Sequence, residues 1–170
     1  MLRTLVIFCT LLLLWHIVAE LNHALAPLHA YVFAGGLFVA YAALRLPLRS
    51  GLAATLLAGL LCDSGIPRED LGMHVILFAA AHAALFHLRD RIPRDDTLGR
   101  IAVVLLVNLA LFLPVSFYQI ADSPAPAAVW PRLLADLLWS QLFLTVVTPW
   151  FLALQERSLV IAGAERESLA

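Results

Sequence analysis

Residues 45–74 read RLPLRSGLAATLLAGLLCDSGIPREDLGMH, and the middle of this stretch decides the fold. Three small residues and a carboxylate recur there at every fourth position: Gly51, Thr55, Gly59 and Asp63. A helix places such positions in one stripe along its length. Small residues at this spacing let another helix approach closely inside a membrane. The stretch therefore predicts a short, tightly packed membrane helix over residues 52–62, which must recruit polar residues at its ends or lie within a bundle.

The whole chain has the composition of a membrane protein. Of its 170 residues, 62% are hydrophobic and 14% are charged, whereas soluble domains contain about 45–50% apolar and about 25% charged residues. One crossing takes about 20 residues, so the length accommodates six crossings and no further domain. The apolar runs occupy residues 5–19, 28–44, 52–62, 73–88, 101–121 and 133–154. We expect an all-α polytopic membrane protein, a compact bundle of six transmembrane helices, with one transmembrane domain over residues 1–155 and a cytoplasmic tail over residues 156–170.

The arginines indicate the orientation, because cytoplasmic loops retain positive charge. If the N-terminus is inside, the cytoplasmic arginines are Arg3, Arg45, Arg49, Arg89, Arg91, Arg94, Arg100, Arg157 and Arg166. Only Arg68 and Arg132 then lie outside. We therefore expect both termini in the cytoplasm and outer loops at residues 20–27, 63–72 and 122–131.

The first apolar run has a second interpretation. Arg3, the run itself and Ala24-Leu25-Ala26 together imitate a secretory signal with its cleavage site. The arginine distribution fits a retained segment, so we expect retention, with cleavage as the alternative.

Several kinds of chemistry are excluded by residues that the sequence lacks. The chain has no lysine, so it has neither a Walker A phosphate loop nor a lysine Schiff base. The motifs HExxH, GxSxG and CxxC are also absent. Eleven arginines against 12 acids leave no basic excess for nucleic acid. Cys9 and Cys62 fall at different depths of the bundle, so no disulfide is expected. We predict a protein that is not an enzyme and has no cofactor.

Polar residues near the ends of the apolar runs are candidate sites. His16, Glu20 and His23 share one face of a helix, and we interpret them as an interfacial polar patch, with a metal site as the alternative. Asp63 is interpreted as an anchor for the loop that follows it, ahead of cation binding. We expect His74 and His82 to form hydrogen bonds between helices.

The last two apolar runs also contain polar residues: Asn108, Ser116, Asp136, Ser140, Gln141 and Thr145. Each should face protein rather than lipid, and Asp136 and Ser140 share one face by their spacing of four. Helix packing is the preferred role. A ligand cavity near the outer surface is the alternative.

Short motifs resemble the bacterial rod shape-determining family MreD. They are Pro47, the block from Gly59 to Asp63 in a G-x-x-x-D pattern, Ser64-Gly65, Leu71-Gly72 before a new apolar run, and Pro149 in the last run. The charged run Arg68-Glu69-Asp70 departs from the family pattern. The resemblance implies a non-catalytic inner-membrane scaffold of the cell-elongation complex. Such a scaffold binds the bitopic protein MreC and links it, indirectly, to MreB filaments and peptidoglycan synthases.

A scaffold of this kind needs a surface for its partner's single helix. The candidates for a lipid-exposed groove and an outer platform are the helices at residues 28–44 and 52–62 with the loop 63–72. In the first of these helices, Gly35, Gly36, Ala40 and Ala43 leave little side-chain bulk, so a partner helix is expected to approach closely there. The alternative function is a substrate-binding component of an energy-coupling-factor transporter. That protein would have a polar outer cavity, whereas a scaffold would have a filled core and an exposed apolar groove.

Overall fold

The described secondary structure is entirely helical, as predicted. The computed structural model describes residues 1–64, 72–92, 96–121 and 126–164. Within these residues lie six α-helices and two 3₁₀ turns. They are α1 (Leu2–Leu25), η1 (Ala26–Leu28), α2 (Gly35–Arg45), α3 (Leu48–Asp63), α4 (Met73–Leu88), η3 (Arg89–Arg91), α5 (Thr97–Ala121) and α6 (Pro126–Ile161).

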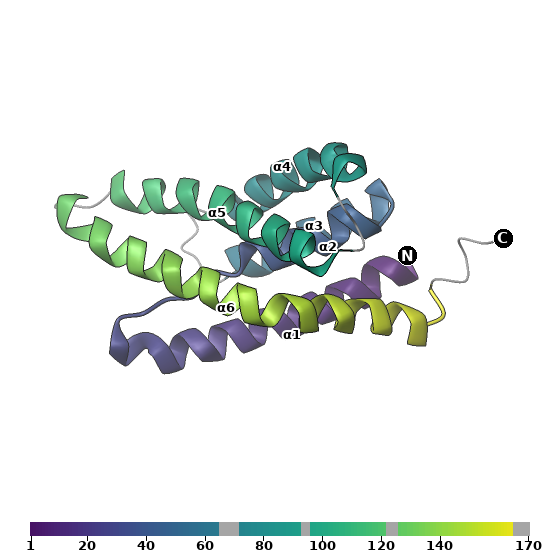
Figure 1. Ribbon diagram of the computed structural model, residues 1–170, viewed down its shortest axis with the longest axis horizontal. Helices are drawn as coiled ribbons and strands as arrows, with labels where there is room; N and C mark the ends of the chain where they lie inside the picture. Colours follow the sequence, from purple (N-terminus) through teal and green to yellow (C-terminus); the bar gives the residue numbers. More distant parts are fainter. Residues whose placement is uncertain (65–71, 93–95, 122–125, 165–170) are drawn as a thin grey trace.

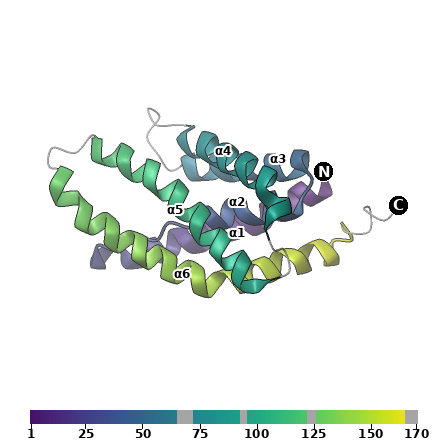
Figure 2. The same cartoon turned by 45° about the horizontal axis from the view of Figure 1, so that its top comes forward.

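The helices form an elongated bundle around α2. In Figure 1, α5 and α6 run beside each other, and α1 runs alongside α6. Helices α3 and α4 lie together on the side of the bundle away from α6. Helix α2 contacts α3, α4, α5 and α6, whereas α1 packs on α3 and α6. The start of α1 and the end of α6 lie at the same end of the bundle, and the end of α5 lies beside the start of α6 at the opposite end (Figures 1 and 2).

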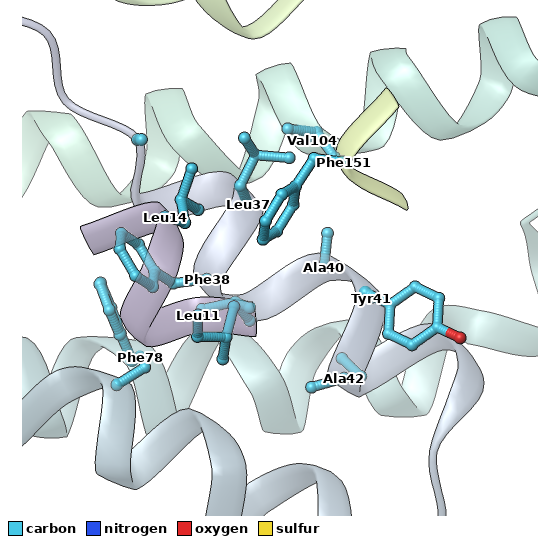
Figure 3. Packing of buried hydrophobic residues seen from close by; sticks show 14 of the residues in the cluster. Leu11, Leu14, Leu37, Phe38, Ala40, Tyr41, Ala42, Phe78, Val104 and Phe151 are labelled. Carbon is cyan, nitrogen blue, oxygen red and sulfur yellow. The ribbon is translucent and has the colours of Figure 1, made fainter. Parts of the chain in front are cut away.

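Helix α2 is the centre of the core. Every residue from 35 to 44 is buried. Figure 3 shows Leu37 and Phe38 of α2 among Leu11 of α1, Val104 of α5 and Phe151 of α6. The expectation of a lipid-exposed groove over residues 28–44 is therefore wrong. Small side chains do mark places where another helix approaches α2 closely, but the helices that approach it belong to the same chain.

The glycines are the points of closest approach. A Cβ atom on Gly36 would collide with the carbonyl oxygen of Val104 in α5. One on Gly51 would lie 2.5 Å from the carbonyl oxygen of Ala42, and one on Gly59 would lie 2.7 Å from the Cα atom of Val75. Backbone atoms cannot move aside as flexible side chains can. All six residues that were predicted to pack against another helix are buried inside the bundle: Gly35, Gly36, Ala40, Gly51, Thr55 and Gly59.

The start of α2 differs from the sequence prediction. Helix was expected from residue 28, but η1 ends there, His29 adopts a left-handed conformation with φ of 53°, and α2 begins only at Gly35. Residues 31–34 form no helix. Apolar composition alone does not distinguish a helix from buried irregular backbone, and the hydrogen bonds described below favour the latter.

Three helices are long and apolar enough to cross a membrane: Leu2–Leu28, Thr97–Tyr118 and Ala128–Ile161. Helices α3 and α4 have 16 residues each, which corresponds to about 24 Å at 1.5 Å per residue. The hydrocarbon core of a bilayer is about 30 Å thick. Six helices are present in the described residues, but three of them are shorter than a full crossing.

The last helix extends beyond its predicted end. Residues 156–170 were expected to form a separate tail, but α6 continues to Ile161. The side chain of Gln155 is fully buried, and its Nε2 atom donates a hydrogen bond to Thr10 Oγ1 at 3.3 Å. Leu159 is also buried against the core. Residues 156–161 thus continue α6 rather than begin a separate segment.

Candidate functional site

The Asp63 carboxylate holds the N-terminus of α4. Its oxygens accept hydrogen bonds from the backbone N–H groups of Gly72 at 3.1 Å, His74 at 3.1 Å and Val75 at 3.2 Å. These are N–H groups that the first turn of a helix cannot bond internally. Asp63 is buried, with 1% of its surface exposed. The predicted anchoring role is confirmed at Gly72, and the anchor extends into α4 itself.

His74 completes the surroundings of Asp63. Its Nδ1 atom lies 2.9 Å from Asp63 Oδ1, so the imidazole donates a fourth hydrogen bond to the carboxylate. The ring also packs edge-on against Phe78, with centroids 5.8 Å apart. The lone pairs of Asp63 are thus occupied by protein donors, which argues against the cation-binding alternative. Gly65 and Arg68 lie outside the described residues.

Thr55 and His82 form a second polar contact between α3 and α4. The Thr55 hydroxyl donates to the carbonyl oxygen of Gly51 at 2.9 Å and lies 3.1 Å from His82 Nδ1. Because the hydroxyl proton is used, Nδ1 must carry the imidazole proton and donate to Thr55. The predicted interhelical hydrogen bonds of His74 and His82 are confirmed.

The stripe on α3 therefore alternates between two kinds of contact. Gly51 and Gly59 allow backbone approach, whereas Thr55 and Asp63 make hydrogen bonds. Both kinds are directed at α4, and Gly51 also contacts α2. The stripe is an internal helix interface.

Side chains from distant helices hold the non-helical residues 31–33. The N–H group of Tyr31 donates to Asp136 Oδ1 at 2.9 Å, and that of Phe33 donates to Ser140 Oγ at 2.9 Å. Asn22 pairs with Val32 through two hydrogen bonds of 2.7 and 3.0 Å, as a neighbouring strand would. Backbone N–H and C=O groups that are buried outside a helix need such partners.

Asn108 continues this pattern on α5. Its Oδ1 atom accepts a hydrogen bond from the N–H group of Gly36 at 3.1 Å, in the first turn of α2. The packing role preferred for Asn108, Asp136 and Ser140 is confirmed, since all three are buried and bonded to other segments. Ser116 is buried as well, and Gln141 bonds to the carbonyl oxygen of Leu105. The prediction that Thr145 faces protein is wrong, because its side chain is exposed and its hydroxyl bonds only to the carbonyl oxygen of Gln141 within α6.

Two cavities of about 300 Å³ each flank the segment at Tyr31 and Phe33. The first also reaches Asn22 and His74, and the second reaches Asp136. These polar groups are already hydrogen-bonded to Val32, Asp63 and the backbone of Tyr31, respectively. The second cavity is also lined by Ser116 and Arg132, so the alternative of a ligand cavity keeps polar groups at this place.

An open apolar groove of about 710 Å³ lies between α1 and α3. It is lined on α1 by residues including Leu2, Leu5 and Phe8 and on α3 by Ser50, Ala53 and Leu57. The three residues of α3 follow a helical spacing of three and four. The short side chains of Ser50 and Ala53 form the floor of the groove, on which a further helix can pack.

The described residues contain no cluster of three or more His, Cys, Asp or Glu side chains that could hold a metal ion. His16, Glu20 and His23 are exposed on α1, as an interfacial patch would be. Cys9 and Cys62 are free thiols.

Comparison with models of known protein families, with curated proteins and with solved structures found no match to this chain. The residues that carry the MreD resemblance nevertheless have definite places. Pro47 precedes α3, and Gly72 precedes α4 with φ of 105°, a conformation that favours glycine. Pro149 lies inside α6. The hairpin of α3 and α4 is thus shaped by Pro47, Gly59, Asp63 and Gly72.

Proposed function

We propose that this protein is a non-catalytic membrane scaffold that resembles MreD and binds an MreC-like single-pass protein. By this proposal it acts in the bacterial inner membrane, near MreB filaments and peptidoglycan synthases. The observation that carries the proposal is the apolar groove between α1 and α3, which lies beside a filled hydrophobic core. This combination is what distinguishes a scaffold from an uptake component.

The proposal includes six crossings with both termini in the cytoplasm. Several arginines gather near the start of α1 and the end of α6: Arg3, Arg45 and Arg89 line one cavity with Glu156, and Arg100 pairs with Glu156. Arg132 lies near the start of α6, at the opposite end. Positive charge marks the cytoplasmic side. The short helix α2 reaches across with the help of the non-helical residues before it, because such backbone spans about 3.3 Å per residue.

The groove suits a helix because its chemistry matches that of a membrane-spanning partner. Leu2, Leu5 and Leu57 are exposed, large and apolar, whereas Ala53 and Ser50 keep the floor shallow. Helices associate in lipid through close packing over such small residues.

A substitution that fills the groove tests the proposal. Ala53→Trp should lower the amount of a co-expressed MreC-like protein that copurifies in mild detergent by about tenfold, because the indole would fill the groove where the partner helix packs. Ala80→Trp is the matched control, because Ala80 is exposed on α4 outside the groove. Equal capture by both variants would refute the groove as the partner site. A small molecule retained by the purified protein, with no bitopic partner, would favour the transporter component instead.

A further inference from the structure

The groove between α1 and α3 has a single charged side chain among its described lining residues, and this side chain lies at one end. Arg49 is the second residue of α3, close to the place where α1 begins. The Thr4 hydroxyl donates a hydrogen bond to the carbonyl oxygen of Ser50 at 3.3 Å, so the first turns of the two helices lie side by side. Apart from Thr4 and Ser50, the rest of the described lining is apolar. The groove is thus apolar along its length and positively charged at one end.

The two hydroxyl groups of the groove already donate their protons within the protein. That of Thr4 goes to the Ser50 carbonyl oxygen, and that of Ser50 goes to the Pro47 carbonyl oxygen at 3.0 Å. A hydroxyl has only one proton to donate. Polar recognition in the groove therefore depends on Arg49.

Arg49 has no carboxylate partner among the residues that the structure describes. Its side chain is exposed, and the arginines that form ion pairs there are Arg45, Arg89, Arg100 and Arg132. The first turns of α1 and α3 contain no acidic residue. Both helices begin at this end of the groove, and their dipoles add partial positive charge to that of the guanidinium. An anionic group is therefore favoured at this end.

Beyond Arg49, the outward face of α3 suits a single helix. Ser50, Ala53, Leu57 and Leu60 follow one another at a spacing of three and four, on a different side of α3 from the stripe that packs on α4. Leu57 and Leu60 are exposed. From Ser50 to Leu60 this face extends about 15 Å at 1.5 Å per residue, which is about three turns of helix. A membrane-spanning helix with a carboxylate near one end complements both the apolar face and the charge.

We propose that the groove takes a single membrane-spanning helix whose end beside Arg49 carries an aspartate or a glutamate. The ion pair fixes the depth at which the partner helix packs, because opposite charges across an interface set its register and exclude wrong partners. This inference rests on the proposed scaffold function and adds the charge by which the groove recognises its partner.

The test reverses the charge of Arg49 in the full chain and measures how much co-expressed MreC-like protein copurifies in mild detergent. Arg49→Glu should lower capture by about tenfold, because it places like charges side by side, and Arg49→Gln should lower it by less. Arg157→Glu is the matched control, because it makes the same change of charge on an exposed residue of α6 that does not line the groove. Equal capture by Arg49→Glu and Arg157→Glu would overturn the proposal. The unfolding temperature should be the same in both variants, which excludes a folding defect.

A reciprocal change on the partner identifies the carboxylate. Each Asp or Glu near either end of the partner's helix is replaced by Arg in turn, and one replacement should restore most of the capture by the Arg49→Glu protein. If none restores it, Arg49 pairs with a lipid head group instead, and the proposal is overturned.

The Ala53→Trp variant separates this inference from the scaffold function. Capture that is lost with Ala53→Trp but kept with Arg49→Glu would reject the ion pair alone. Capture that is kept with Ala53→Trp would reject the groove itself as the partner site.

Discussion

The contact between α3 and α4 and the non-helical segment at residues 31–33 both depend on buried polar groups, but their partners lie at very different distances along the chain. Asp63 and His74 are 11 residues apart. Tyr31 and Asp136 are 105 residues apart. The first arrangement follows from one helical stripe and the helix after it. The second depends on where the last helix lies in the finished bundle. The spacing of polar residues in the sequence thus predicts which helix faces are polar. It does not predict which non-helical backbone groups will hydrogen-bond to those faces.

The largest effect on stability is expected at Gly36, in the first turn of α2 and shortly after the non-helical segment. Gly36→Leu should destabilise the protein by about 3 kcal/mol or more, because the new side chain would meet the α5 backbone at Val104, which cannot move aside. Thermal unfolding in detergent measures the loss. Ala110→Leu on the exposed face of α5 is the control and should change little. An equally stable Gly36→Leu protein would contradict the central position of α2.

A smaller loss is expected at the α3–α4 contact. Asp63→Ala should cost about 2–3 kcal/mol, because it leaves buried N–H groups of Gly72, His74 and Val75 without an acceptor. Asp63→Asn should lose less, since its amide oxygen still accepts. The ranking of the two unfolding temperatures checks this prediction. If both variants match the unchanged protein, water rather than Asp63 satisfies these groups.

The smallest effect is expected where one of several bonds to the non-helical segment is removed. Ser140→Ala should cost about 1 kcal/mol, because Phe33 loses its acceptor while Tyr31 and Val32 keep theirs. Thr145→Ala is the control, since its hydroxyl bonds only within α6 on an exposed face. Chemical unfolding in detergent compares the two. An equal response would mean that Ser140 does not fix the segment.

Much of the fold followed from local patterns. The sequence predicted the all-helical class, the packing of Gly51 and Gly59, and the histidine bonds between helices, because helical periodicity carries this information directly. The start of α2 and the place of the exposed groove were missed. Residues 30–34 carry no charge and have the same apolar and aromatic side chains in either conformation. The partners that hydrogen-bond to residues 31–33 lie on α1 and α6. Small residues predict a close contact without identifying which helix makes it.

The side chains that bond to residues 31–33 become available at different times during synthesis. Asp136 enters the chain 105 residues after Tyr31, and Ser140 enters 107 residues after Phe33. At about 5–20 residues per second, the ribosome supplies these acceptors roughly 5–20 s later. During that interval only Asn22 is present to pair with the segment. The nascent first half of the protein must therefore keep these backbone groups near water or within the insertion machinery until α6 is made.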